Sequence, residues 1–205
     1  PDQFDDELID ELASNDKIVK YLDIPIQHIN DKILKTMNRR GTGEEIRSLF
    51  KTLRERIPDL VLRTSLIAGL PGEGEAEFEE LCEFLREARI ERVGVFPFSP
   101  EEGTPAAAME HVDFEEAQRR ADIILELQAP IMDEFCSGFV GRTIRVLCDG
   151  YDEESGLKTG RSYADSPDID GQVLFSGTAA EGDMTDVLIQ SAEDGILYGE
   201  EVSRS

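Results

Sequence analysis

The sequence predicts an α/β protein with parallel strands, followed by a small antiparallel β-barrel. Up to residue 137, apolar strand-like runs alternate with amphipathic helical patterns across short links. This order favours parallel strands joined by crossover helices in an α/β layer or barrel. After residue 138, five short strand-like runs lie between clusters of Gly, Asp, Ser and Pro, without any helical period, which is typical of a small barrel. We therefore expect two domains, residues 1–137 and 138–205.

The first elements are predicted from side-chain periodicity and helix caps. Residues 4–14 place their apolar side chains on one face of a short helix. The β-branched and aromatic residues 18–26 predict a strand that closes at residues 27–28. Asn30 is a suitable N-cap for the helix that follows, because its side-chain oxygen can accept backbone N–H groups.

The central strand is predicted over residues 60–68, an apolar run that contains one charge, Arg63. Before it, Thr42 and Glu45 match a capping box and indicate the start of a helix. After it, the chain turns through Gly-Leu-Pro-Gly-Glu, residues 69–73, into another amphipathic helix. An apolar run ended in this way predicts a buried parallel strand that feeds a crossover helix.

The remaining elements complete the expected fold. Residues 92–99 predict a third strand, and a polar, turn-rich loop follows over residues 99–105. Asp113 and Glu116 open a long helix, in which Pro130 should cause a kink. The expected barrel strands are residues 143–148, 159–164, 172–175, 185–190 and 196–199.

Turn-forming and polar residues follow three predicted strands, at residues 27–28, 69–73 and 96–104. Because ligands bind at the carboxyl ends of parallel strands, we expect these segments to face one mouth. Residues 69–73 match neither a Walker loop nor a dinucleotide fingerprint, and an ordinary strand-to-helix turn is the alternative. Arg63 within a buried strand needs a negative partner, either an internal carboxylate or a carboxylate or phosphate of a ligand.

The composition excludes several classes of protein. A net charge of −24 argues against nonspecific binding to nucleic acid or anionic membranes, and favours a basic partner or high solubility. No apolar run approaches the ~18 residues of a membrane span. Cys82, Cys136 and Cys148 lack metal-ligand spacing, so we expect a reduced, cytoplasmic chain with cysteines in the core and no metal site. We expect His28 and His111 to be structural, and no catalytic residue can be assigned.

Four motifs, taken together and in order, resemble a known family. They are residues 23–28 (DIPIQH), 34–40 (LKTMNRR), 69–73 (GLPGE, preceded by Arg63) and 98–104 (FSPEEGT). In this combination they resemble the radical S-adenosylmethionine methylthiotransferases. Within that family, they are most similar to the members that methylthiolate an aspartate of a small-subunit ribosomal protein.

The resemblance implies half of a radical-SAM partial (βα) barrel, followed by an OB-like TRAM barrel. It implies S-adenosylmethionine as cofactor and two [4Fe-4S] clusters in the full-length enzyme, where reductive cleavage gives a radical that takes hydrogen from the aspartate β-carbon before sulfur is inserted and methylated. The family's CxxxCxxC cluster loop does not occur in this sequence. Since thiolates hold such clusters, we expect this chain to ligate none and to be inactive alone.

The resemblance also implies two sets of contact residues near the strand ends. The expected cofactor-binding residues are Gln27, Arg63, Ile67, Gly69, Pro71, Gly72, Glu73 and Phe96. The expected substrate rim consists of Ser99, Glu101, Gly103 and Thr104.

Charge favours a protein substrate over RNA. Residues 138–205 contain 5 Lys/Arg and 14 Asp/Glu, a net charge of −9, whereas RNA-binding barrels are expected to be basic. We therefore expect this barrel to dock a basic small-subunit ribosomal protein and not to bind RNA. The alternatives are a transfer-RNA methylthiotransferase of the same family, a non-catalytic protein-binding module, and a non-radical α/β enzyme that uses Arg63 for a phosphate.

Overall fold

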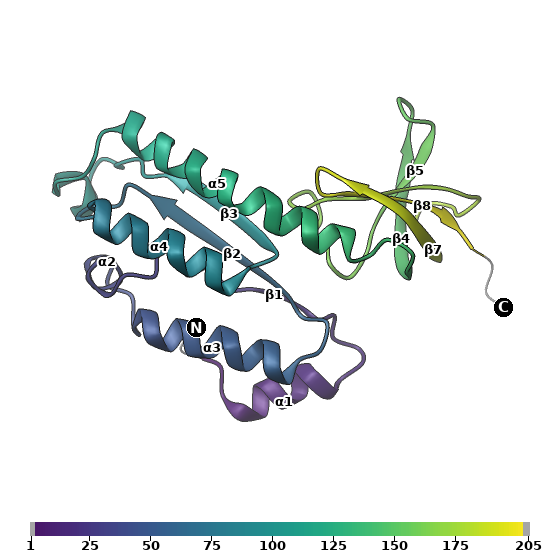
Figure 1. Ribbon diagram of the computed structural model, residues 1–205, viewed down its shortest axis with the longest axis horizontal. Helices are drawn as coiled ribbons and strands as arrows, with labels where there is room; N and C mark the ends of the chain where they lie inside the picture. The colour runs from purple at the N-terminus through teal and green to yellow at the C-terminus, as the bar shows by residue number, and fades with distance from the viewer. Residues whose placement is uncertain (1–2, 203–205) are drawn as a thin grey trace. The chain divides into compact units, whose positions relative to one another are not determined.

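The computed structural model of the chain describes residues 3–202 and contains two compact units, residues 1–129 and 130–205. The division falls within the helix α5 (Phe114–Ser137), whereas the sequence predicts a domain boundary after residue 137. In Figure 1, the first unit runs from purple to green and the second from green to yellow. None of the helices formed by residues 3–202 is long and apolar enough to cross a bilayer.

The first unit is a three-stranded parallel sheet with helices, as the sequence predicts. β2 lies in the centre, between β1 and β3. In chain order, the elements up to the start of α5 are α1 (Asp6–Ser14), β1 (Tyr21–Asp23), α2 (Asp31–Thr36), α3 (Gly43–Arg56), β2 (Val61–Ala68), α4 (Glu75–Ala88), β3 (Arg92–Pro97) and the 3₁₀ turn η1 (Pro105–Ala108).

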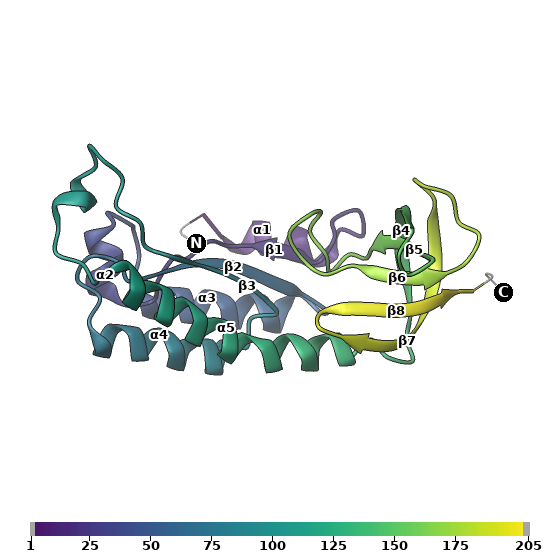
Figure 2. The same ribbon diagram turned by 90° about the horizontal axis from the view of Figure 1, so that it is seen from above.

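The two faces of this sheet differ in burial. Along β2, Leu62, Thr64 and Leu66 are fully buried, while the residues between them are partly exposed. This alternation follows from the two-residue period of a strand. In Figure 2, α3, α4 and the first part of α5 lie on one side of β2 and β3, and their apolar side chains cover that face, with Phe50 and Phe84 in the core. The other side of the sheet, where the alternate residues of β2 are partly exposed, is called the open face below.

The helices begin where their caps predict. The Asn30 side chain accepts hydrogen bonds from two backbone N–H groups at the start of α2. The capping box of Thr42 and Glu45 is formed at the start of α3. The Asp113 carboxylate accepts the backbone N–H of Glu116 at 2.8 Å. α5 is helical through Pro130, and the kink expected there stays a prediction.

The strand predicted over residues 18–26 is wrong in its extent, since β1 covers only Tyr21–Asp23. Pro25 interrupts the ladder because proline has no backbone N–H group to donate. The chain nevertheless stays beside β2, since the backbone N–H of Ile24 donates to the Arg63 carbonyl at 2.8 Å. Gln27 then forms an isolated parallel bridge with Leu66.

The second unit is a closed barrel with the strand order β4-β5-β6-β8-β7. Each of the five predicted runs corresponds to one strand. The strands are β4 (Thr143–Asp152), β5 (Leu157–Arg161), β6 (Val173–Ser176), β7 (Met184–Glu193) and β8 (Ile196–Glu201). The predicted run 159–164 extends too far, because the chain leaves the ladder at Ser162, whose N–H and hydroxyl both bond the Asp165 carboxylate.

The barrel is not antiparallel throughout, which corrects the expectation from the sequence. β6 and β8 pair in parallel, whereas the other neighbouring strands are antiparallel. A closed ring with an odd number of strands cannot alternate in direction all the way round. One parallel pair is therefore the minimum for a five-stranded barrel, and the β6–β8 pair supplies it.

Candidate functional site

The open face of the first unit brings together side chains from neighbouring strands. The parallel register pairs Arg63 with Arg92, Ser65 with Gly94, and Ile67 with Phe96. Residues paired in this way project from the same side of a parallel sheet, so Ile67 and Phe96 form an apolar end of the face. Phe96 is 58% exposed, which is unusual for an aromatic side chain that a sheet could cover.

The backbone of Gln27 runs beside this end of β2, in the chain that continues β1. Its backbone N–H donates to the Ser65 carbonyl at 2.9 Å, and its carbonyl accepts the N–H of Ile67 at 3.0 Å. Gln27 has a φ of 69°, a left-handed conformation that costs a residue with a side chain of order 1–2 kcal/mol. Such strained residues cluster at ligand-binding positions. The backbone of Gln27 thus lies beside Ile67, which pairs with Phe96, and contact of the three with a cofactor stays a prediction.

Arg63 lies toward the other end of the same face and makes an internal ion pair. Its Nη1 atom is 2.6 Å from Asp23 Oδ2, and its side chain is 11% exposed. Gly94 leaves space beside it, since a Cβ atom at this position would lie 3.5 Å from Arg63 Nη2. Of the two partners that the sequence allows, the internal carboxylate is therefore present, and a ligand contact by Arg63 stays a prediction.

The turn after β2 packs against the start of α5. Gly69 has a φ of 83°, and a Cβ atom there would lie only 2.5 Å from Ala117 Cβ. Gly72 has the same φ but a more open environment, in which Lys32 Nζ donates to its carbonyl at 2.9 Å. Pro71 between them is buried. Only glycine satisfies both the conformation and the close packing at Gly69.

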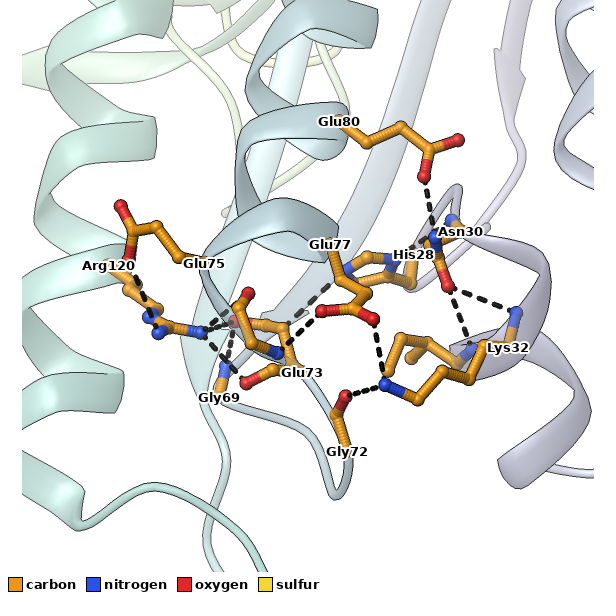
Figure 3. A network of polar contacts seen from close by, with 12 residues as sticks. His28, Asn30, Lys32, Gly69, Gly72, Glu73, Glu75, Glu77, Glu80 and Arg120 are labelled. Carbon is orange, nitrogen blue, oxygen red and sulfur yellow. Dashed lines mark hydrogen bonds and ion pairs between the residues drawn. The ribbon is translucent and has the colours of Figure 1, made fainter.

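Glu73 turns into the protein interior instead of toward the open face. Its side chain is 0% exposed, and its carboxylate accepts the N–H of Gly69 at 2.9 Å and Arg120 Nη1 at 2.8 Å. His28 Nε2 lies 3.4 Å from the second carboxylate oxygen, in contact with it but without hydrogen-bond geometry (Figure 3). Burial raises the pKa of Glu73, but His28, Arg120 and the Gly69 N–H together lower it below its ordinary value.

The expected substrate rim is an exposed loop after β3. Its first residue pairs with the sheet, since the N–H of Phe98 donates to the Ala68 carbonyl at 2.7 Å. Thr104 caps η1 by accepting the N–H of Ala107, and its hydroxyl donates to the Glu101 carbonyl at 2.7 Å. Ser99, Glu101, Gly103 and Thr104 are all exposed. Their role in binding a substrate stays a prediction.

Sequence reasoning missed several residues of this region. Arg120 is the most important of them, because it lies 47 positions from Glu73 and no local pattern connects the two. Ser65 and Gly94 belong to the open face and were also missed. The strict alternation of β2 around Arg63 could have indicated Ser65, whereas Gly94 requires the register with β3.

The cysteines do not form a metal site in this unit or the next. Cys82, Cys136 and Cys148 are buried, as predicted, and they lie on α4, α5 and β4. Within residues 3–202, no group of three or more His, Cys, Asp or Glu side chains is arranged to hold a metal ion. The side chains present therefore do not fit an iron–sulfur cluster, which needs converging thiolates.

Two protein-family models match the chain, one in each unit. Residues 1–85 match the radical SAM superfamily, and residues 140–202 match the TRAM domain. The solved structure of coproporphyrinogen III oxidase from Escherichia coli, described as a radical SAM enzyme, superposes with a TM-score of 0.52 at 17% identity. It covers 63% of this chain and 30% of that one, a likeness that shows the fold alone. Fold and sequence thus define a radical SAM half-barrel followed by a TRAM barrel.

Curated relatives show which radical SAM proteins the chain is similar to. The chain is 44% identical over 203 residues to "Ribosomal protein uS12 methylthiotransferase RimO" from Bdellovibrio bacteriovorus, covering 98% of this chain and 44% of the relative. Proteins of the same name from Acetivibrio thermocellus and Geobacter sulfurreducens are 43% and 45% identical, each with 46% of its length covered. The chain is RimO-like, and its resemblance to the radical SAM methylthiotransferases is confirmed. It spans about half the length of the curated relatives it matches.

Proposed function

We propose that this chain forms the cofactor-facing half-barrel and the substrate-docking barrel of a methylthiotransferase. The whole enzyme adds a methylthio group to the β-carbon of an aspartate in ribosomal protein uS12. The names of the relatives support the ribosomal protein as substrate. The observation on which the proposal rests is the open face, where an exposed aromatic side chain, an aliphatic side chain and polar groups lie on one side of a parallel sheet.

The open face fits S-adenosylmethionine in its chemistry. Phe96 and Ile67 offer apolar contact for the adenine ring, and Ser65 offers a hydroxyl group on the same face. Gln27, whose backbone pairs with β2 beside Ile67, is expected to add an amide group. Gly94 adds no side chain of its own between Arg63, Ser65 and Phe96, whose side-chain atoms lie within 4.0 Å of the position a Cβ would take there. When bound, S-adenosylmethionine supplies the radical chemistry and the methyl group, while the protein binds it, orients it and excludes water. Arg63, Gly69, Pro71 and Gly72 complete the expected cofactor region, whereas the buried Glu73 cannot contact a ligand there directly, contrary to the contact expected for it.

Direct measurement of S-adenosylmethionine binding tests this assignment. We expect Phe96→Ala to weaken binding by roughly 5- to 150-fold, since stacking of a base on an aromatic ring contributes about 1–3 kcal/mol. Phe114→Ala is a matched control, because Phe114 is 59% exposed on α5 and Phe96 is 58% exposed on β3. Isothermal titration of the purified chain provides the comparison. Absence of binding, or an equal effect of the two substitutions, would overturn the assignment.

The barrel is proposed to dock the basic substrate protein. Its net charge of −9 over residues 138–205 attracts a cationic protein and repels RNA. We expect fluorescence anisotropy to show binding of purified uS12 to this chain that weakens as salt rises, and no binding of transfer RNA. Tight, salt-sensitive binding of transfer RNA would instead favour a transfer-RNA methylthiotransferase. Binding of uS12 without any binding of S-adenosylmethionine would favour a non-catalytic docking module.

The clusters of the full-length enzyme are proposed to be held by residues outside this chain. The three buried cysteines lie on separate elements, and residues 3–202 hold no group of side chains arranged for a metal ion. We therefore expect this chain alone to be inactive. Iron and sulfide analysis of the chain after anaerobic reconstitution tests this expectation, and a stoichiometric cluster would contradict it.

A further inference from the structure

A single buried carboxylate connects three separate segments of the first unit. Glu73 accepts the backbone N–H of Gly69, at the carboxyl end of β2, at 2.9 Å. It contacts His28, the residue after Gln27, at 3.4 Å. It also pairs at 2.8 Å with Arg120 from α5. Figure 3 shows Glu73 between the Gly69 backbone and the side chains of His28 and Arg120.

Arg120 is itself held from several sides. Its side chain is 5% exposed, and its Nε atom donates to Glu116 at 2.7 Å. Its Nη1 atom donates to both the carboxylate and the backbone carbonyl of Glu73, at 2.8 and 3.1 Å. The guanidinium also lies over the Phe78 ring, 5.2 Å from its centroid. Because a buried ion pair is stable only when its remaining polar groups are satisfied, these contacts fix the position of Arg120.

His28 completes the connection to the first strand. The side chain is fully buried, and Nδ1 accepts the backbone N–H of Asn30 at 3.0 Å. This bond requires Nδ1 to be without a proton, so in the neutral ring the proton lies on Nε2, toward Glu73. The imidazole is therefore oriented on one side by the cap of α2 and on the other by the carboxylate.

A buried carboxylate in this arrangement cannot touch a ligand on the open face. Glu73 has no exposed side-chain surface, and its contacts all point to protein groups. It can influence the face only through the segments that it joins. We propose that Arg120, Glu73 and His28 form a positioning cluster, which fixes the turn at residues 69–72 and the strand end at Gln27 for S-adenosylmethionine binding. The role in binding rests on the proposed function, whereas the fixing of the two segments does not.

The chain contains a matched control for this cluster. Glu91 is another buried carboxylate that accepts a β2 backbone N–H, that of Leu62, at 2.9 Å. It also pairs with an arginine, since Arg54 Nη1 lies 2.6 Å away. Glu73 and Glu91 therefore have the same chemistry at opposite ends of one strand. Loss of the negative charge at either residue should lower the stability of the fold. Only Glu73 lies at the carboxyl end of β2, next to the turn at residues 69–72.

Residue-level amide hydrogen exchange of the full chain tests the proposal. We expect Glu73→Gln to speed exchange at Gly69 and Gln27 by about tenfold or more relative to Leu62, since a hydrogen bond to a charged group contributes at least this factor. We expect Glu91→Gln to speed exchange at Leu62 relative to Gly69 and Gln27. Arg120→Lys, which keeps the charge but loses the fork of donors, should show a smaller change at the same amides and serves if Glu73→Gln does not fold. Uniform acceleration across β2 in either Glu73 or Arg120 variant would overturn the proposal, because it is the result of a general loss of stability.

Binding of S-adenosylhomocysteine separates this proposal from the proposed function. We expect Glu73→Gln to weaken binding by about tenfold or more, and Glu91→Gln to leave it unchanged. If the unsubstituted chain does not bind this ligand, the proposed function fails, while the exchange rates still decide whether the cluster fixes the two segments. If binding is unaltered by Glu73→Gln although exchange at Gly69 is accelerated, the role of the cluster in binding is overturned.

Discussion

Replacement of Gly69 by alanine should destabilise the first unit more than the same change at Gly72. Both glycines have a φ of 83°, so each substitution places a side chain in the left-handed region. Their surroundings differ. A Cβ atom at Gly69 would lie 2.5 Å from Ala117 Cβ and 3.1 Å from Ala117 Cα, whereas at Gly72 the nearest atom is Lys32 Cε at 3.7 Å.

The magnitudes follow from these two contributions. The left-handed conformation of a non-glycine residue costs about 1–2 kcal/mol at either position. Overpacking adds about 1–3 kcal/mol at Gly69 alone, because Ala117 is part of a helix backbone that has to move as a whole. We therefore expect the free energy of unfolding to fall by about 1–2 kcal/mol for Gly72→Ala and by about 2–5 kcal/mol for Gly69→Ala.

Urea denaturation followed by circular dichroism at 222 nm measures this difference. All helices in the described part of the chain lie before residue 138, so the signal reports mainly on the first unit. Gly72→Ala is the internal control, since it introduces the same conformational cost without the clash. Equal losses of stability in the two variants would refute the packing argument, and a larger loss for Gly72→Ala would contradict it outright.

Two further predictions concern ionisable groups. Burial raises the pKa of the Cys82 thiol to about 11, so we expect a thiol reagent at about pH 8 to label Cys82 only when the chain unfolds, and rapid stoichiometric labelling of the folded chain would contradict this. Glu73 has a lowered pKa, and Arg119 and Arg120 lower the pKa of Glu116 to about 2. The stability that these carboxylates contribute is present above their ordinary pKa of 4.5 and is lost as the pH falls toward the folded values. The urea midpoint should therefore be steady above about pH 5 and fall below it, whereas a fall that begins near pH 6.5 would indicate a histidine instead.

Local signals in the sequence predicted much of the fold. The capping box of Thr42 and Glu45 and the caps at Asn30 and Asp113 are formed as expected, because each depends on residues within one turn of helix. The apolar run around Arg63 became the central strand for a similarly local reason, since it is long, apolar and ended by Gly and Pro.

The predictions that were wrong or incomplete concern features that depend on residues far away in the sequence or on the geometry of strand pairing. The short β1 follows from a proline whose effect depends on strand pairing, and the parallel β6–β8 pair follows from closure of an odd ring. The buried position of Glu73 depends on Arg120, which is 47 residues away. For the candidate site, the sequence predicted that residues 27–28, 69–73 and 96–104 face one mouth, but Gly94 and Ser65 needed the register of two strands.

The strand order of the barrel limits when that unit can fold during synthesis. β8 lies between β6 and β7, so the ring cannot close until Glu201 has left the ribosomal exit tunnel. The three strands of the first unit, in contrast, have all emerged once Pro97 has left the tunnel. Since nascent chains fold from the N-terminus as they are made, the half-barrel has time to collapse while the acidic barrel is still an open chain, and premature termination just before β8 would leave a sheet with two unpaired edges.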